Sequence, residues 1–106
     1  MIKEITVQDL QIKFNNSDDF ILLDVRNDNE VLLSKIDHSI HIPMNEIPQR
    51  ISELDKNKEI IVQCKIGKRS AKVCEYLMQN NFENVKNLSG GILAWAKEID
   101  NTMQVY

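Results

Sequence analysis

Long hydrophobic runs are absent from this sequence. The longest uninterrupted apolar stretch covers residues 20–23, whereas a membrane-spanning helix needs about 20 predominantly apolar residues. Residues 1–4 do not begin the pattern of a basic region followed by an apolar stretch that marks a secretory signal. We therefore expect a protein that has no membrane segment and is located in the cytoplasm.

Cysteine is scarce, and positive charge is not in excess. The two cysteines, Cys64 and Cys74, are too few for a disulfide framework, so both are expected to be free thiols. The formal net charge of −3 has the wrong sign for a general nucleic-acid binder. Too few aromatic residues lie near the basic cluster at residues 65–69 to stack on bases. We therefore expect no nucleic-acid partner.

The order of the expected elements predicts the fold class. A length of 106 residues suits one domain, and no repeat, low-complexity tract or linker divides the chain, so we predict a single domain over residues 1–106. Hydrophobic patterns predict strands at residues 2–5, 20–25, 39–42, 58–63 and 84–88. They predict helices at residues 7–15, 28–34, 46–54 and 71–80, and a last helix that follows Gly90 and Gly91 and ends near Ile99. The alternation predicts an α/β fold with a central, mainly parallel five-stranded sheet and helices on both faces.

Three of these helices have polar residues suited to capping at their expected starts. Thr6, Asn45 and Ser70 are predicted to be N-caps, because their short polar side chains can accept a hydrogen bond from the first turn. Pro48 is compatible with the helix at 46–54, since it falls in the first turn.

Cys64 directly follows an expected strand and precedes an expected helix. In open α/β sheets, ligands bind beyond the carboxyl ends of the strands. A cysteine reacts as its thiolate, so a catalytic cysteine needs surroundings that favour an anion. Gly67 gives the loop the freedom to turn its backbone N–H groups inward, and the following helix directs its positive end at the same place. We therefore predict Cys64 as the catalytic nucleophile and an anion-binding loop made by Lys65, Ile66, Gly67, Lys68, Arg69 and Ser70.

Other interpretations of the two thiols remain open at this point. Cys64 could simply end its strand as a small buried hydrophobic residue. Cys74 shares a helix face with Ala71, Leu77 and Met78, which favours a core position. The alternative for Cys74 is a resolving thiol for Cys64, but its place along the helix and its core-facing side disfavour that role.

Further polar residues have structural and functional interpretations. Asp24 and Arg26 follow a strand expected to be buried, which favours a structural ion pair or loop hydrogen bonds, with support of the site by Asp24 and Arg26 as the alternative. His38 and His41 are expected to diverge, and no carboxylate or cysteine pattern completes a metal site around them. Trp95 lies on the apolar face of the last expected helix and is assigned to the core or to a partner surface.

Four stretches of this sequence, in order, resemble motifs of the rhodanese homology family. They are LDVR at residues 23–26 with Glu30 soon after, IHIP at residues 40–43, VQCKIGKRS at residues 62–70 and LSGGILAW at residues 88–95. The third resembles the active-site loop of that family and is the most specific. The segment from Trp95 to Tyr106 is similar to the tail of rhodanese domains that are fused to adenylyltransferases.

The resemblance implies a doubly wound α/β domain with thiosulfate sulfurtransferase-like activity. It implies that Cys64 carries sulfane sulfur as a covalent persulfide, with no other cofactor. The implied donors are thiosulfate or the persulfide of a cysteine desulfurase. The implied acceptors are cyanide, a thiol such as that of a thioredoxin-like protein, or a sulfur-carrier protein. Lys68 and Arg69 are candidates for holding an anionic donor or an acidic partner surface.

Two alternatives to the enzyme remain. One is a non-catalytic persulfide carrier or interaction module. The other is a relative of phosphatases or arsenate reductases, which the loop disfavours, because four residues separate Cys64 from Arg69 where the related phosphatases have five. The chain departs from the family pattern at residues 34–38, SKIDH, where we expect a loop of different shape at the entrance to the site.

Overall fold

The computed structural model describes residues 2–104 and contains one five-stranded sheet. Its spatial order is β1-β5-β4-β2-β3, and every neighbouring pair is parallel. This confirms the predicted mainly parallel five-stranded sheet. The strands are β1 (Lys3–Ile5), β2 (Phe20–Asp24), β3 (Ile40–His41), β4 (Glu59–Gln63) and β5 (Val85–Leu88).

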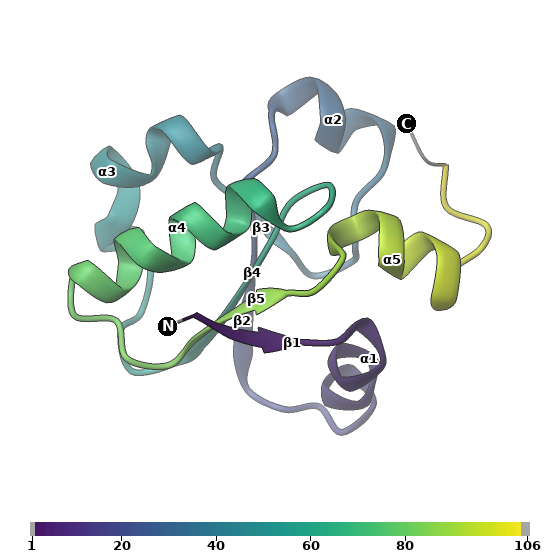
Figure 1. The fold of residues 1–106 in the computed structure, drawn as a ribbon, viewed down its shortest axis with the longest axis horizontal. Helices are drawn as coiled ribbons and strands as arrows, with labels where there is room; N and C mark the ends of the chain where they lie inside the picture. The colour runs from purple at the N-terminus through teal and green to yellow at the C-terminus, as the bar shows by residue number, and fades with distance from the viewer. Residues whose placement is uncertain (1, 105–106) are drawn as a thin grey trace.

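Helices cover both faces of this sheet, as predicted (Figure 1). The α3 and α4 helices pack on one face, and α1 and α5 pack on the other. None of the helices in the described part of the chain is long and apolar enough to cross a membrane. The helices are α1 (Val7–Asn15), α2 (Asp28–Leu33), α3 (Ile47–Arg50), α4 (Lys68–Gln79) and α5 (Gly91–Glu98).

The central strands separate two apolar clusters. Ile60 and Val62 of β4 point into the cluster beneath α3 and α4, whereas Ile61 points into the cluster beneath α1 and α5. Successive side chains of a strand point to opposite faces of the sheet, so a strand covered on both faces is apolar at every position. This geometry explains why continuous apolar runs predicted these strands. Trp95 packs in the second cluster and is 9% exposed, which confirms its core assignment.

Of the three predicted N-caps, one is confirmed and two are wrong. Thr6 caps α1, where the Asp9 amide donates to its hydroxyl oxygen at 3.1 Å. The α4 helix begins at Lys68 rather than after Ser70, and Gly67 occupies the N-cap position with φ +108°. Glycine adopts this left-handed backbone without a Cβ penalty, so the helix starts earlier and Ser70 lies inside its first turn.

The predicted helix at residues 46–54 is confirmed only in part. The segment folds as a 3₁₀ turn (Met44–Glu46), the short α3 helix and a second 3₁₀ turn (Ile51–Glu53), and Asn45 lies inside the first of these and caps nothing. Ile47 and Leu54 are buried, and Ile51 packs against the same apolar cluster. The helical turns are interrupted at Arg50, whose backbone angles of φ −116° and ψ 9° depart from those of an α-helix.

Candidate active site

Cys64 lies immediately after β4, at the carboxyl edge of the sheet. Residues 64–67 connect that strand to α4, which is the position predicted for a ligand site. The Cys64 side chain is 1% exposed. Its thiol is therefore surrounded by protein, and the atoms around the sulfur decide whether it is a reactive group or a core residue.

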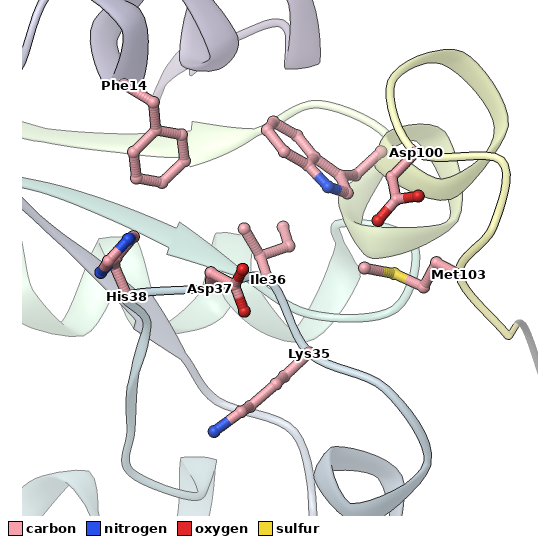
Figure 2. A pocket seen from close by; sticks show the side chains of 8 residues that line it. Phe14, Lys35, Ile36, Asp37, His38, Asp100 and Met103 are labelled. Carbon is pink, nitrogen blue, oxygen red and sulfur yellow. The ribbon is translucent and has the colours of Figure 1, made fainter.

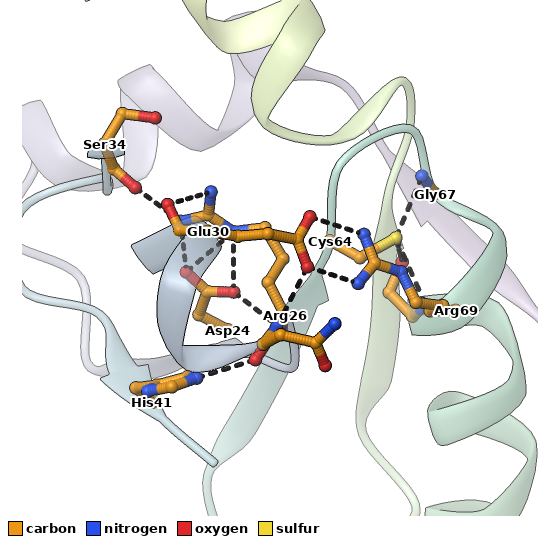
Figure 3. A network of polar contacts seen from close by, with 10 residues as sticks. Asp24, Arg26, Glu30, Ser34, His41, Cys64, Gly67 and Arg69 are labelled. Atoms are coloured by element: carbon orange, nitrogen blue, oxygen red, sulfur yellow. Dashed lines mark hydrogen bonds and ion pairs between the residues drawn. The ribbon is translucent and has the colours of Figure 1, made fainter. Parts of the chain in front are cut away.

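Backbone amides donate hydrogen bonds to the sulfur (Figure 3). The Gly67 amide donates to Cys64 Sγ at 3.1 Å, and the Ser70 amide donates to it at 3.4 Å. Ser70 Oγ lies 3.3 Å from the same sulfur. Inward-pointing backbone N–H groups at the start of a helix form a site for an anion. The loop thus has the shape of an anion cradle around Cys64.

The two cysteines have opposite shifts of pKa. Burial alone raises the pKa of the Cys64 thiol, but the Ser70 hydroxyl and the amides of Ser70, Gly67 and Ile66 outweigh burial and hold this pKa below its ordinary value. Burial, with the nearby charge of Glu4, raises the pKa of Cys74 to about 12. Cys74 is fully buried in the apolar cluster, which confirms its predicted core position. A thiol whose pKa is lowered and a thiol whose pKa is raised therefore lie in the same helix–loop unit.

Asn87 of β5 holds the loop from the neighbouring strand. Its Nδ2 atom donates to the Gly67 carbonyl and to a Glu4 carboxylate oxygen, each at 3.0 Å. Its Oδ1 atom accepts a short hydrogen bond from the Ser70 hydroxyl. Asn87 thus positions the same hydroxyl that lies 3.3 Å from Cys64 Sγ. Sequence reasoning missed Asn87, and the only local signal is a polar residue near the end of a buried strand.

The start of α5 closes the loop from the other side. The Ile92 amide donates to the Cys64 carbonyl at 2.9 Å, and the Leu93 amide donates to the Lys65 carbonyl at 3.1 Å. This contact requires glycine at position 91, where a Cβ would lie 2.4 Å from the Lys65 oxygen and 2.5 Å from the Cys64 oxygen. Gly91 is therefore needed for close approach as well as for the turn.

Asp24 and Arg26 form a buried ion pair, as predicted. Arg26 Nη2 lies 2.7 Å from Asp24 Oδ2, and both side chains are almost completely buried. The guanidinium also donates to the Ser34 carbonyl at 2.7 Å, and the His41 ring lies 2.7 Å from the Arg26 carbonyl. Arg26 thus ties the ends of β2 and α2 together beneath the loop.

The basic residues of the loop occupy different positions. Lys68 is exposed and Lys65 is half-buried, and Ile66 exposes 48% of its surface at the tip of the loop. Arg69 makes a bidentate ion pair with Glu30 of α2, with Nη1–Oε1 and Nη2–Oε2 distances of 2.6 and 2.9 Å. Figure 3 shows this pair beside the loop that carries Cys64. The sequence motif includes Glu30 but does not indicate its partner, which is 39 residues away.

Residues 35–38 of the divergent loop line a cavity of about 310 Å³ on the side of the sheet that carries α1 and α5 (Figure 2). No residue of the 64–70 loop lines this cavity. Among the described residues, no group of three or more His, Cys, Asp or Glu side chains could hold a metal ion. The cavity is lined by Phe14, Lys35, Ile36, Asp37, His38, Trp95, Asp100 and Met103.

The sequence and fold of this chain are similar to those of known proteins. The family model of the rhodanese-like domain matches residues 6–98. A sulfurtransferase of Allochromatium vinosum is 37% identical over 97 residues, covering 92% of this chain and 91% of its own. YtwF of Bacillus subtilis is 41% identical over 97 residues, covering 92% and 93% of the two chains. A crystal structure of a rhodanese-like domain protein from Staphylococcus aureus superposes with a TM-score of 0.86 at 34% identity and covers 99% of each chain.

The expected likeness to fused domains is also present. The adenylyltransferase and sulfurtransferase MOCS3 of Danio rerio is 29% identical over 126 residues, which cover 98% of this chain and 28% of that protein. Val105 and Tyr106, the end of the tail compared above, lie outside the described residues.

Proposed function

Because this chain belongs to the rhodanese-like domain family, we propose that it is a sulfurtransferase that carries sulfane sulfur as a persulfide on Cys64. The observation that carries the proposal is the pair of backbone amides, from Gly67 and Ser70, that donate to the Cys64 sulfur. These donors favour the thiolate over the thiol, and the thiolate is the nucleophile.

The first step loads sulfur onto the cysteine. With thiosulfate, the Cys64 thiolate attacks the outer sulfur and forms a new S–S bond. The original S–S bond breaks, and sulfite leaves with the electron pair. With a persulfide donor such as that of a cysteine desulfurase, the leaving group is the donor thiolate. The amides of the loop stabilise the negative charge of the resting thiolate and of the persulfide that replaces it.

The second step unloads the cysteine. An acceptor nucleophile attacks the terminal sulfur, the bond to Cys64 Sγ breaks, and its electron pair regenerates the thiolate. Cyanide yields thiocyanate, and a thiol yields a new persulfide. In a cell, we propose a thioredoxin-like thiol or a sulfur-carrier protein as the acceptor, in a reducing compartment such as the cytoplasm, where Cys64 stays free.

Thiosulfate-to-cyanide turnover by wild type and Cys64→Ser tests the proposal. We expect turnover by the wild type and none by the variant, because serine lacks the polarisable sulfur nucleophile. Turnover by Cys64→Ser at the wild-type rate would end the proposal. If small donors give no turnover but a desulfurase and cysteine still place sulfur on Cys64, the protein is a persulfide carrier.

A phosphatase function receives less support from the site. Four residues separate Cys64 from Arg69, and the Arg69 guanidinium is held by Glu30. A chromogenic phosphate ester tests this alternative, and we expect no hydrolysis by the wild type.

A further inference from the structure

The Glu30–Arg69 ion pair places a carboxylate at the rim of the proposed sulfur site. Glu30 lies in the first turn of α2, where one of its oxygens also accepts from the Asn27 amide at 3.0 Å. Its side chain is 13% exposed, and that of Arg69 is 33% exposed. The pair is therefore partly buried, held from both sides and oriented by three hydrogen bonds, unlike a mobile surface ion pair.

Arg69 is next to the cradle in the chain. It directly precedes Ser70, whose amide and hydroxyl both lie against Cys64 Sγ. A guanidinium here attracts an incoming anion, but the bidentate carboxylate of Glu30 cancels one unit of that positive charge. A small donor that approaches Cys64 thus meets less positive charge than the run of Lys65, Lys68 and Arg69 suggests.

We infer that Glu30 is a specificity-determining residue that disfavours small dianionic donors such as thiosulfate and favours persulfide donors of lower negative charge. This inference rests on the proposed function and adds the class of donor. The energy of interaction between an ion and the unit charge of Glu30 is proportional to the charge of the ion. The effect of Glu30 on a dianion is therefore about twice its effect on a monoanion.

The same field acts on any charged reagent that approaches Cys64, so it can be measured without sulfur transfer. Iodoacetate is an anion, iodoacetamide is neutral, and both alkylate a thiolate by displacement of iodide. The ratio of their rates at Cys64 reports the local charge, because a change in the pKa of the thiol affects both rates equally. Peptide mapping confines the measurement to Cys64.

The test variant is Glu30→Gln. Glutamine keeps an oxygen that can accept from the Asn27 amide but removes the charge. We expect the ratio of iodoacetate to iodoacetamide rates to rise about fivefold, the size of effect that one unit charge has at a distance of several ångströms in a highly polar medium. The double variant Glu30→Gln/Arg69→Gln should return to the wild-type ratio, because it restores the balance of charge.

Glu53→Gln is the matched control. Glu53 makes a similar two-oxygen ion pair with Arg50, at 2.9 and 3.1 Å, at the junction of α3 and the following 3₁₀ turn. The Glu53→Gln substitution also removes one negative charge, but outside the loop that carries Cys64, and it should leave the ratio of alkylation rates unchanged. If Glu30→Gln does not fold, Arg69→Gln provides the same test with opposite sign. This variant removes the positive charge that balances the Glu30 carboxylate, so the ratio of iodoacetate to iodoacetamide rates should fall about fivefold.

The donor preference is then measured directly. We expect Glu30→Gln to raise kcat/KM for thiosulfate more than kcat/KM for a monoanionic alkanethiosulfonate. An unchanged alkylation ratio in Glu30→Gln, or an equal change in Glu53→Gln, overturns the inference whether or not the protein transfers sulfur. A raised ratio in a protein that loads no sulfur from either donor supports the effect of Glu30 on the site but refutes the proposed function.

Discussion

Replacement of Gly91 by alanine should displace the loop that carries Cys64, although Gly91 lies outside that loop. The new Cβ would lie 2.4 to 2.6 Å from three backbone atoms of Cys64 and Lys65, and backbone cannot swing aside as a flexible side chain does. Relief of these contacts requires α5 and the loop to separate by roughly 1 Å. That movement breaks the two hydrogen bonds from the Ile92 and Leu93 amides to the loop carbonyls.

The free-energy cost follows from these contacts. Two backbone hydrogen bonds contribute about 1 kcal/mol each, and a positive φ, here +60°, costs a non-glycine residue about 1–2 kcal/mol. The total destabilisation of Gly91→Ala is therefore about 3–4 kcal/mol. For a domain of this size, that corresponds to a fall in Tm of roughly 12–30 °C.

Gly67→Ala is the matched comparison. Its Cβ would meet no atom closer than 3.6 Å, so it has space, and only its φ of +108° is unfavourable. We expect a cost of about 1–2 kcal/mol. Urea unfolding of both variants measures the difference, and the rate of Cys64 alkylation shows whether the loop has moved. If the two substitutions cost the same, or if Gly91→Ala keeps wild-type stability, the close approach of α5 to the loop is not what holds the site.

Three further substitutions test single interactions. Ser70→Ala removes a hydroxyl that lowers the pKa of Cys64, so the midpoint of the alkylation rate against pH should move to higher pH. An unchanged midpoint would show that the hydroxyl does not act on the sulfur. Arg26→Met leaves Asp24 buried without its partner and should lower the free energy of unfolding by about 3–5 kcal/mol in urea, whereas a loss below about 1 kcal/mol would contradict the buried pair. Gln63→Met replaces a buried side-chain amide that has no hydrogen-bond partner among the described residues, and it should raise the free energy of unfolding by about 1 kcal/mol. Lower stability of that variant in the same assay would refute this interpretation of Gln63.

The strands and the place of the thiol could be predicted because their signals are local. Residues of β2 and β4 are apolar at successive positions, since both faces of the sheet are covered. A cysteine directly after such a strand must lie at the carboxyl edge of the sheet, where Cys64 is found. The sequence predicted Ser70 as the N-cap of α4, because serine is a common N-cap residue. That prediction was wrong, since Gly67 takes the N-cap position in a left-handed conformation that depends on the packing of the whole loop.

The residues that hold the loop could not be predicted, because they come from distant parts of the chain. Asn87 reaches Gly67 only because β5 lies beside β4. Glu30 reaches Arg69 only because α2 follows β2, which is the neighbour of β4 on its other edge. The order β1-β5-β4-β2-β3 is set by tertiary packing. Hydrophobic patterns show which residues are buried in a sheet, but they do not show which strands are neighbours.

The intact mass of the protein after incubation with a sulfane-sulfur donor tests the central claim most directly. Wild type incubated with thiosulfate, or with a cysteine desulfurase and cysteine, should gain the mass of one sulfur atom, located on the peptide that contains Cys64 and removed by a thiol. Cys64→Ser should gain nothing under the same conditions. A wild-type protein that stays unmodified with both donors, or a sulfur atom found on Cys74 instead, would contradict the account.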